Sequence, residues 1–126
     1  MSERSKSDAP GYEIDCRERY AIIRFLRVMS YEEFCAMIDD VVERGISARC
    51  LWLMGEYLRF SPAEMSSIAE YARGRNPNAS RFAFVTEDDV SFGMTRLYSA
   101  HRDTEGFDQR VFRDEAEAVA WLEQPV

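Results

Sequence analysis

The hydrophobic and polar positions along this chain follow two periods, one typical of β-strands and the other typical of amphipathic helices. Short apolar runs predict strands at Tyr12–Cys16, Tyr20–Leu26, Cys50–Met54, Phe82–Val85 and Gln109–Phe112. The run Cys50–Met54 shows almost no alternation, which is typical of a strand covered on both faces. The first two runs are joined by the charged turn Arg17–Arg19, so they are predicted to form a β-hairpin.

Other segments repeat apolar residues every three or four positions, as helices do when one face packs on a core. The clearest begins at the capping sequence Ser30–Glu33 and is predicted to end at Gly45. The second begins at Ser61–Glu64, with a proline at the first helical position. The third follows Thr86–Asp89, and the last begins at a further capping box, Asp114–Glu117. The stripes expected to face the core are Tyr31, Phe34, Cys35, Ile38, Val41 and Val42 in the first helix, Met65, Ile68, Ala69 and Ala72 in the second, and Val90, Met94, Leu97 and Tyr98 in the third.

The predicted order of elements is β-β-α-β-α-β-α-β-α, in which helices and strands alternate after the opening hairpin. This order predicts an α/β fold with a mostly parallel five-stranded sheet, right-handed crossovers and one antiparallel strand at the N-terminal edge. At 126 residues the chain is predicted to form a single domain over residues 11–126, preceded by a polar, disordered tail at residues 1–10.

Charge and cysteine content narrow the classes of partner and compartment. The sequence has 16 basic and 23 acidic residues, a net charge of −7, which argues against binding to nucleic acid or to an anionic membrane surface. Three scattered cysteines fit neither a disulfide framework nor a zinc site, and Cys35 and Cys50 are expected in the core. The first ten residues lack the apolar stretch of a secretory leader, and no apolar run approaches the roughly 20 residues that a membrane span needs. We therefore expect a cytoplasmic protein without a secretory leader.

The motifs of nucleotide-binding and hydrolytic enzymes are missing from the sequence. No glycine-rich turn follows a predicted strand, and the single lysine, Lys6, lies in the tail. His101 is the single histidine, and a general base there would need a partner that the sequence does not place. Asp88 and Asp89 lack a ligand-spaced third group, so helix capping is expected there rather than metal binding. We therefore expect no catalytic residue, no metal and no cofactor.

The segment Met54–Ser61 is the strongest candidate for a functional site. It leaves the carboxyl end of the predicted central strand, where open α/β sheets tend to bind ligands. Its charged and aromatic side chains suit a partner surface or the rim of a pocket, namely Glu56, Tyr57, Arg59 and Phe60. A structural alternative is that Tyr57, Leu58 and Phe60 tuck under the edge of the sheet as a small satellite cluster.

Two residues of the third predicted helix call for an explanation. Gly93 costs about 1 kcal/mol relative to alanine inside a helix. Close approach of another backbone, of a ligand or of the sheet would account for it. Arg96 lies at the edge of the predicted buried stripe, and we expect it to pair with an acidic residue or a carbonyl group.

Three stretches carry a family resemblance: the strand ending Leu51–Leu53, the run Phe84–Tyr98 and the closing run Val111–Leu122. The spacing of Gly93 and Arg96 and the final Glu-Ala-X-X-Trp-Leu sequence are their most specific parts. Together with the element order, they resemble the SpoIIAA-like group of the STAS and CRAL-TRIO class of small α/β domains. The resemblance implies a right-handed βα superhelix with its strands in nearly sequential order.

The resemblance also implies a role, because STAS domains commonly act as binding or regulatory modules. In anti-sigma antagonists of this class, a phosphorylated serine at a helix N-terminus switches partner binding. Ser61 lies in the corresponding region, without the D-S-S-G-like motif. We expect a non-enzymatic domain that acts through association with a protein partner or with a second copy of itself as a homodimer. The alternative is a carrier or sensor of a small hydrophobic molecule or lipid, as the CRAL-TRIO side of the class suggests. The candidate binding residues are Glu56, Tyr57, Arg59, Phe60, Ser61, Ser91 and Arg96.

Overall fold

The computed structural model describes residues 10–45, 48–73, 75, 80–101 and 108–125, without the side chain of His101. Apart from Pro10, the predicted tail therefore lies outside the described residues. Within those residues the order of elements agrees with the prediction. The elements are β1 (Tyr12–Cys16), β2 (Ala21–Phe25), α1 (Tyr31–Glu43), β3 (Arg49–Gly55), α2 (Pro62–Ala72), β4 (Arg81–Thr86), α3 (Asp89–His101), β5 (Asp108–Phe112) and α4 (Glu115–Leu122).

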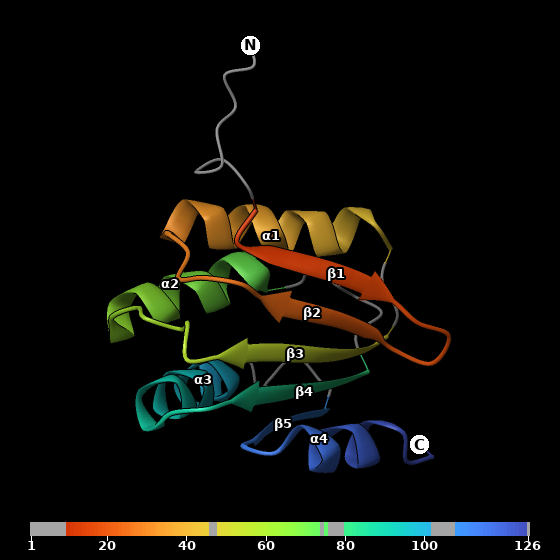
Figure 1. The fold of residues 1–126 in the computed structure, drawn as a ribbon. Coiled ribbons are helices and arrows are strands. Elements are labelled where there is room, and N and C mark those ends of the chain that lie inside the picture. Colours follow the sequence, from red (N-terminus) through yellow and green to blue (C-terminus); the bar gives the residue numbers. More distant parts are fainter. Residues whose placement is uncertain (1–9, 46–47, 74, 76–79, 102–107, 126) are drawn as a thin grey trace.

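The strands form one sheet in the order β1-β2-β3-β4-β5, so neighbours in sequence are also neighbours in space (Figure 1). β1 is antiparallel to β2, with Ile14 opposite Ile23, which confirms the predicted hairpin. The remaining pairs are parallel, with Ile23 beside Trp52 and Trp52 beside Phe84. The structure therefore confirms the predicted α/β class, with its mostly parallel five-stranded sheet and antiparallel N-terminal edge strand.

Helices cover both faces of the sheet, but unequally. Helices α1, α2 and α3 pack on one face, which we call the three-helix face, where Ile23, Trp52 and Phe84 belong to one buried cluster. Helix α4 packs on the opposite face, the α4 face, where Leu51 and Leu122 belong to a second buried cluster. Alternate side chains of β3 point to the two faces, and both faces are covered by helices. Every residue from 50 to 54 is therefore at most 7% exposed. The prediction of a strand covered on both faces is confirmed.

The capping signals in the sequence set the starts of the first two helices and the end of the first. The Ser30 hydroxyl accepts a hydrogen bond from the backbone N–H of Glu33, whose carboxylate accepts one from the Ser30 N–H. Ser61 and Glu64 form the same reciprocal pair at the start of α2. After α1, Gly45 has a φ of 61°, which glycine adopts at little cost. The capping boxes at Ser30 and Ser61 and the end of α1 are confirmed. At the third predicted box the Asp114 carboxylate accepts the Glu117 N–H at 3.2 Å, which is one half of the reciprocal pair.

The predicted buried stripe of α3 is wrong at its first position. Val90 is 55% exposed, whereas Ser91 and Thr95 are buried. The buried hydroxyls have partners, because Thr95 Oγ1 donates to the Ser91 carbonyl at 2.7 Å and Arg59 donates to Ser91 Oγ at 2.9 Å. These hydrogen bonds let α3 turn polar residues towards the sheet, which apolar periodicity does not reveal.

Two other burial predictions need correction. Met37 of α1 is fully buried although it lies outside the predicted stripe, and Val42 at the end of that stripe is 37% exposed. Cys35 is half-buried rather than part of the core, whereas Cys50 is fully buried as expected. Burial raises the pKa of the Cys50 thiol to about 12, so this thiol stays protonated at neutral pH.

Two arginines from the beginnings of β3 and β4 bind the C-terminal end of α4. Arg49 donates to the Leu122 carbonyl at 2.8 Å, and Arg81 donates to the Trp121 and Gln124 carbonyls at 3.0 and 2.9 Å. Arg81 is buried, and its guanidinium carbon lies 5.1 Å from the centroid of the Trp121 ring. Because α4 has no basic residue in its own last turn, these arginines supply the positive charge that a helix C-terminus favours.

We expect the Glu33 carboxyl group to titrate near pH 2. Hydrogen bonds from the Arg27 guanidinium and the Ser30 N–H hold its pKa at about 2, below the ordinary 4.5. A depressed folded-state pKa contributes stability that is fully present above pH 4.5 and is lost as the pH falls through about 2. An NMR titration of the side-chain carboxyl carbon measures this pKa. In Arg27→Gln the midpoint should move back towards the ordinary value, and an unchanged midpoint would contradict the assignment.

Candidate functional site

The loop after β3 begins with a glycine in a left-handed conformation. Gly55 has a φ of 56°, which turns the chain directly at the carboxyl end of the strand. The Tyr57 N–H donates to the Met54 carbonyl at 3.1 Å, and the Glu87 N–H donates to the Gly55 carbonyl at 2.9 Å. The loop is therefore fixed to the neighbouring segment between β4 and α3. The role of Gly55 could not be predicted from the sequence, because a single glycine does not reveal its φ.

The apolar side chains of this loop contact the core. Leu58 is 2% exposed, and Tyr57 and Phe60 are partly buried against the cluster of the three-helix face. The Phe60 ring meets the Phe34 ring of α1 edge to face, with 5.5 Å between the centroids. The structural alternative considered from the sequence thus describes the packing of these three side chains. Tyr57 also reaches the surface, where it lines a groove described below.

Arg59 joins the loop to the beginning of α3. Its guanidinium forms an ion pair with Asp88 Oδ2 at 3.0 Å and donates to Ser91 Oγ at 2.9 Å and to the Leu58 carbonyl at 3.2 Å. Hydrogen bonding to Ser91 and the nearby Arg59 charge lower the pKa of Asp88. The structure therefore brings Arg59 and Ser91 together, as two of the candidate residues. Because Asp88 already neutralises Arg59, this cluster holds the loop in place and presents no free positive charge to an anion.

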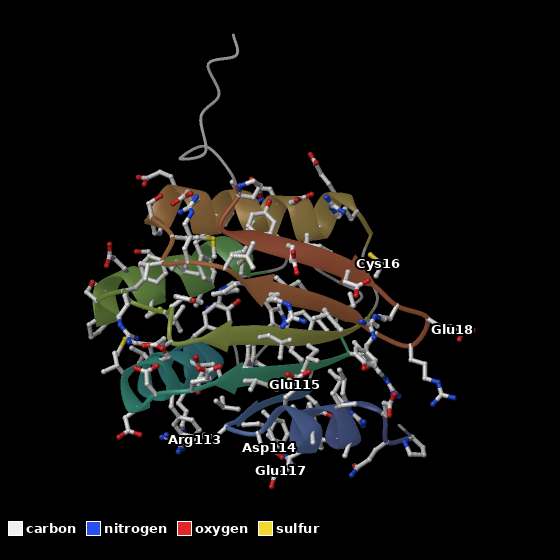
Figure 2. The ribbon with its side chains drawn as sticks, viewed as in Figure 1. Cys16, Glu18, Arg113, Asp114, Glu115 and Glu117 are labelled. Atoms are coloured by element: carbon white, nitrogen blue, oxygen red, sulfur yellow. The ribbon has the colours of Figure 1, made fainter. Side chains whose placement is uncertain are left out.

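An open groove of about 290 Å³ lies along the carboxyl ends of the parallel strands. We call it the carboxyl-edge groove. Its apolar members are Phe25, Leu53, Val85, Gly55 and the Tyr57 ring, and its charged members are Arg24, Glu87, Arg113 and Glu115. Figure 2 shows Arg113 and Glu115 where β5 passes into α4. Of the candidate residues, Tyr57 lines this groove. The sequence predicted a site at this edge, but not the charged residues around it, which come from three separate segments of the chain.

The other candidate residues lie outside the carboxyl-edge groove. Glu56 is exposed, and Ser61 is exposed with its hydroxyl accepting the capping hydrogen bond of α2. Arg96 is exposed on α3, and its guanidinium carbon lies 6.0 Å from the centroid of the Phe92 ring. Among the described residues, this aromatic contact replaces the acidic or carbonyl partner that we expected for Arg96.

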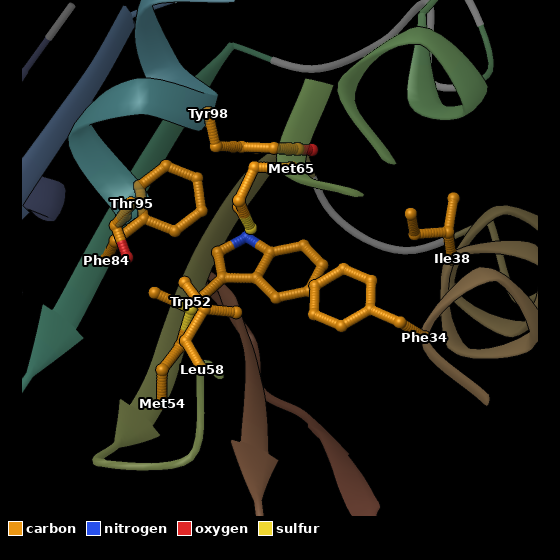
Figure 3. A pocket seen from close by; sticks show the side chains of 9 residues that line it. All are labelled: Phe34, Ile38, Trp52, Met54, Leu58, Met65, Phe84, Thr95 and Tyr98. Atoms are coloured by element: carbon orange, nitrogen blue, oxygen red, sulfur yellow. The ribbon is translucent and has the colours of Figure 1, made fainter. Parts of the chain in front are cut away.

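A small cavity lies between the sheet and the helices of the three-helix face (Figure 3). It has a volume of about 20 Å³ and is lined mainly by apolar and aromatic side chains, including Phe34, Met65 and Phe84. This volume holds about one water molecule. The Trp52 indole N–H, drawn in Figure 3, is buried without a hydrogen-bond partner within the described structure. The cavity as it stands has no room for a lipid chain.

Among the described residues, neither another backbone nor the sheet approaches Gly93 closely enough to require a glycine. A methyl group built on its α carbon meets no atom within 4 Å beyond its neighbours and the backbone of its own helix, and the residue is exposed. We expect Gly93→Ala to raise the free energy of unfolding by about 0.5–1 kcal/mol, because alanine removes backbone freedom from the unfolded chain and favours the helix. Urea unfolding of the two proteins measures the difference. A loss of stability would show that the glycine is needed for a contact.

Several classes of site find no support in the described part of the chain. No group of three or more His, Cys, Asp and Glu side chains there could hold a metal ion. Within the same residues, no helix has both the length and the apolar character that a bilayer crossing requires. The side chain of His101 lies outside the described residues, so the expectation that it is not a general base stays a prediction.

The chain is a small α/β domain with a five-stranded mixed sheet, in which β1 and β2 are antiparallel and the other pairs are parallel. Its element order is consistent with a SpoIIAA-like topology. Comparisons with family models, with curated proteins and with solved structures found no match to this chain.

Proposed function

We propose that this chain is a non-enzymatic binding domain of the SpoIIAA-like type, which acts through protein–protein association at the carboxyl-edge groove. The observation that carries the proposal is the chemistry of that groove. Leu53 and Val85 give it an apolar floor, and side chains of both charges surround them. Apolar contact area with charges around it is the arrangement in which protein interfaces combine affinity with specificity. The location at the carboxyl ends of parallel strands is also where α/β domains bind their ligands.

The available volumes favour a protein partner over an enclosed hydrophobic molecule. The carboxyl-edge groove is open and measures about 290 Å³, enough for one or two side chains of a partner. The cavity behind Trp52 measures about 20 Å³. A carrier would have to separate the helices from the sheet to enclose a lipid, so carriage of a hydrophobic molecule remains the second candidate. The proposal includes a reducing, cytoplasmic compartment, which the three free cysteines support.

Site-specific photocrosslinking in the native cell tests this proposal. A photoreactive phenylalanine analogue replaces Glu87, which is exposed and lines the carboxyl-edge groove. The matched control replaces Ser67, which is exposed on α2 of the three-helix face. We expect a discrete crosslinked protein at position 87 that is absent at position 67. Adding Tyr57→Ala should reduce its yield by about tenfold, because partly buried aromatic side chains often dominate binding energy.

Three results would count against the proposal. Equal crosslinking at both positions would show that contact is non-specific. A yield unaffected by Tyr57→Ala would place the interface elsewhere. A purified protein that carries a reproducible small-molecule mass in native mass spectrometry, without crosslinks at position 87, would favour the carrier.

A further inference from the structure

The strand β5 forms an edge of the sheet, beyond β4 (Figure 1). The Asp108 N–H donates to the Ser80 carbonyl at 3.0 Å, on the β4 side. Backbone groups of a parallel strand point alternately to its two neighbours, so the N–H and C=O groups of Gln109 and Val111 point to the open side. Within the described residues no strand pairs with that side. An exposed row of this kind is a template for another extended segment.

A second groove runs between this edge strand and α3. It measures about 470 Å³ and lies on the three-helix face, so it is separate from the carboxyl-edge groove. We call it the β5-edge groove; its main lining residues are Phe92, Arg96, Ser99, Gln109, Arg110 and Val111. Ser99 Oγ and Gln109 Oε1 are buried there without a hydrogen-bond partner in the described structure. Unpaired buried polar atoms are costly, and a bound segment with suitable donors would relieve that cost.

Two arginines at this groove have no acidic partner within the described residues. Arg96 and Arg110 are exposed, and their guanidinium groups contact the rings of Phe92 and Trp121, at 6.0 and 5.2 Å from the centroids. Arginines elsewhere, such as Arg17, form ion pairs. Arg96 and Arg110 place two positive charges along an edge strand whose exposed acidic residue, Asp108, lies at its start, and this charge suits an acidic ligand.

We propose that the β5 edge binds an extended, acidic segment of a protein partner, which adds to the sheet as a further strand. Backbone hydrogen bonds to Gln109 and Val111 hold the segment. Carboxylates on its alternate faces pair with Arg96 on the α3 side and with Arg110 on the α4 side. Addition of a strand to a sheet edge is a common mode of peptide recognition, in which the backbone gives affinity and the side chains give specificity. This proposal does not depend on the carboxyl-edge groove.

Fluorescence anisotropy with the full chain tests the charge requirement. The probe is a labelled peptide of about ten residues, long enough to cover a strand. Pairs of glutamates alternate with pairs of threonines in it, so both faces of the extended peptide carry carboxylates. The control peptide has glutamine in place of every glutamate. We expect the double variant Arg96→Glu/Arg110→Glu to weaken binding of the acidic peptide by at least about tenfold, because attraction becomes repulsion. Arg17→Glu, in the hairpin turn, should change binding by less than about twofold, because exposed charges act over short distances in salt.

Amide hydrogen exchange tests whether the bound peptide pairs with β5 as an added strand. The amide protons of Gln109 and Val111 should exchange more slowly when the acidic peptide is bound, whereas those of exposed residues on α2 should not change. Binding without this protection would overturn strand addition. Equal binding of the glutamine peptide, or an unchanged affinity of the double arginine variant for the acidic peptide, would show that the bound segment does not need acidic side chains.

Sedimentation of the protein alone tests whether the segment that binds the β5 edge comes from another protein or from a second copy of this chain. The edge strand β1 carries the exposed acidic residues Glu13 and Asp15, so it is the segment of a second copy that would fit this groove. We expect no self-association through this edge at low salt. Self-association that both Arg96→Glu/Arg110→Glu and Glu13→Lys/Asp15→Lys abolish would show that the occupant is β1 of another copy, and the partner proposal would fall.

Discussion

Replacing Leu122 by alanine is expected to lower the free energy of unfolding by about 3 kcal/mol, within the range of about 2–5 kcal/mol for buried leucines. Leu122 is fully buried at the end of α4, in the same cluster as Leu51 and Val85. Helix α4 is 8 residues long, too short to be stable alone, so its packing on the sheet holds it. Urea unfolding followed by circular dichroism measures the loss.

Val119 provides a matched control on the same helix. It is partly buried against the same cluster, so Val119→Ala should cost distinctly less than Leu122→Ala. Similar costs for the two substitutions would mean that Leu122 is not the main anchor of α4. A cost below about 1 kcal/mol for Leu122→Ala would show that this face of the sheet contributes little to stability.

The second large effect is expected at Arg81. Arg81→Met keeps much of the side-chain volume but removes the donors to the Trp121 and Gln124 carbonyls. We expect a loss of about 2–3 kcal/mol in the free energy of unfolding. Hydrogen bonds from charged donors contribute about 1.5–3 kcal/mol each, and removing the buried charge also removes its desolvation cost, which offsets part of the loss. Urea unfolding measures the change in free energy.

Arg110→Met is the matched control for Arg81→Met. Arg110 is exposed and contacts the same Trp121 ring, with its guanidinium carbon 5.2 Å from the centroid. If the carbonyl hydrogen bonds of Arg81 matter, Arg110→Met should cost no more than about 0.5–1 kcal/mol. Equal losses would assign the stabilisation to ring stacking. A small loss in Arg110→Met would also confirm that Arg110 can be substituted in binding experiments without unfolding the chain.

The sequence predicted the elements well because their signals are local. The capping boxes at Ser30 and Ser61 lie within four residues each, and the apolar run of β3 is continuous. Short connections between alternating strands and helices left few alternatives for the sheet, and the predicted order was confirmed.

The candidate site was harder to predict because its contacts join distant positions. The hydrogen bond between Arg59 and Ser91 spans 32 residues. Once Arg59 and the turn of α3 satisfy the Ser91 and Thr95 side chains, α3 can bury hydroxyl groups and expose Val90. Apolar periodicity assigns the opposite orientation, since it treats every polar side chain as solvent-facing. The sequence indicated the edge of the sheet where the carboxyl-edge groove lies. The charged residues around the groove could be identified only from the structure.

The sequential strand order has a consequence for the way the chain can fold during synthesis. Each strand from β2 onwards pairs with the strand made just before it, so no strand waits for a later one to be inserted beside it. The sheet can therefore extend one strand at a time as the polypeptide emerges, with the newest strand always at the growing margin. Domains whose strands insert between earlier ones must keep a gap open until synthesis reaches it, which prolongs exposure of unpaired edges. In this chain the order of synthesis and the order in space are the same.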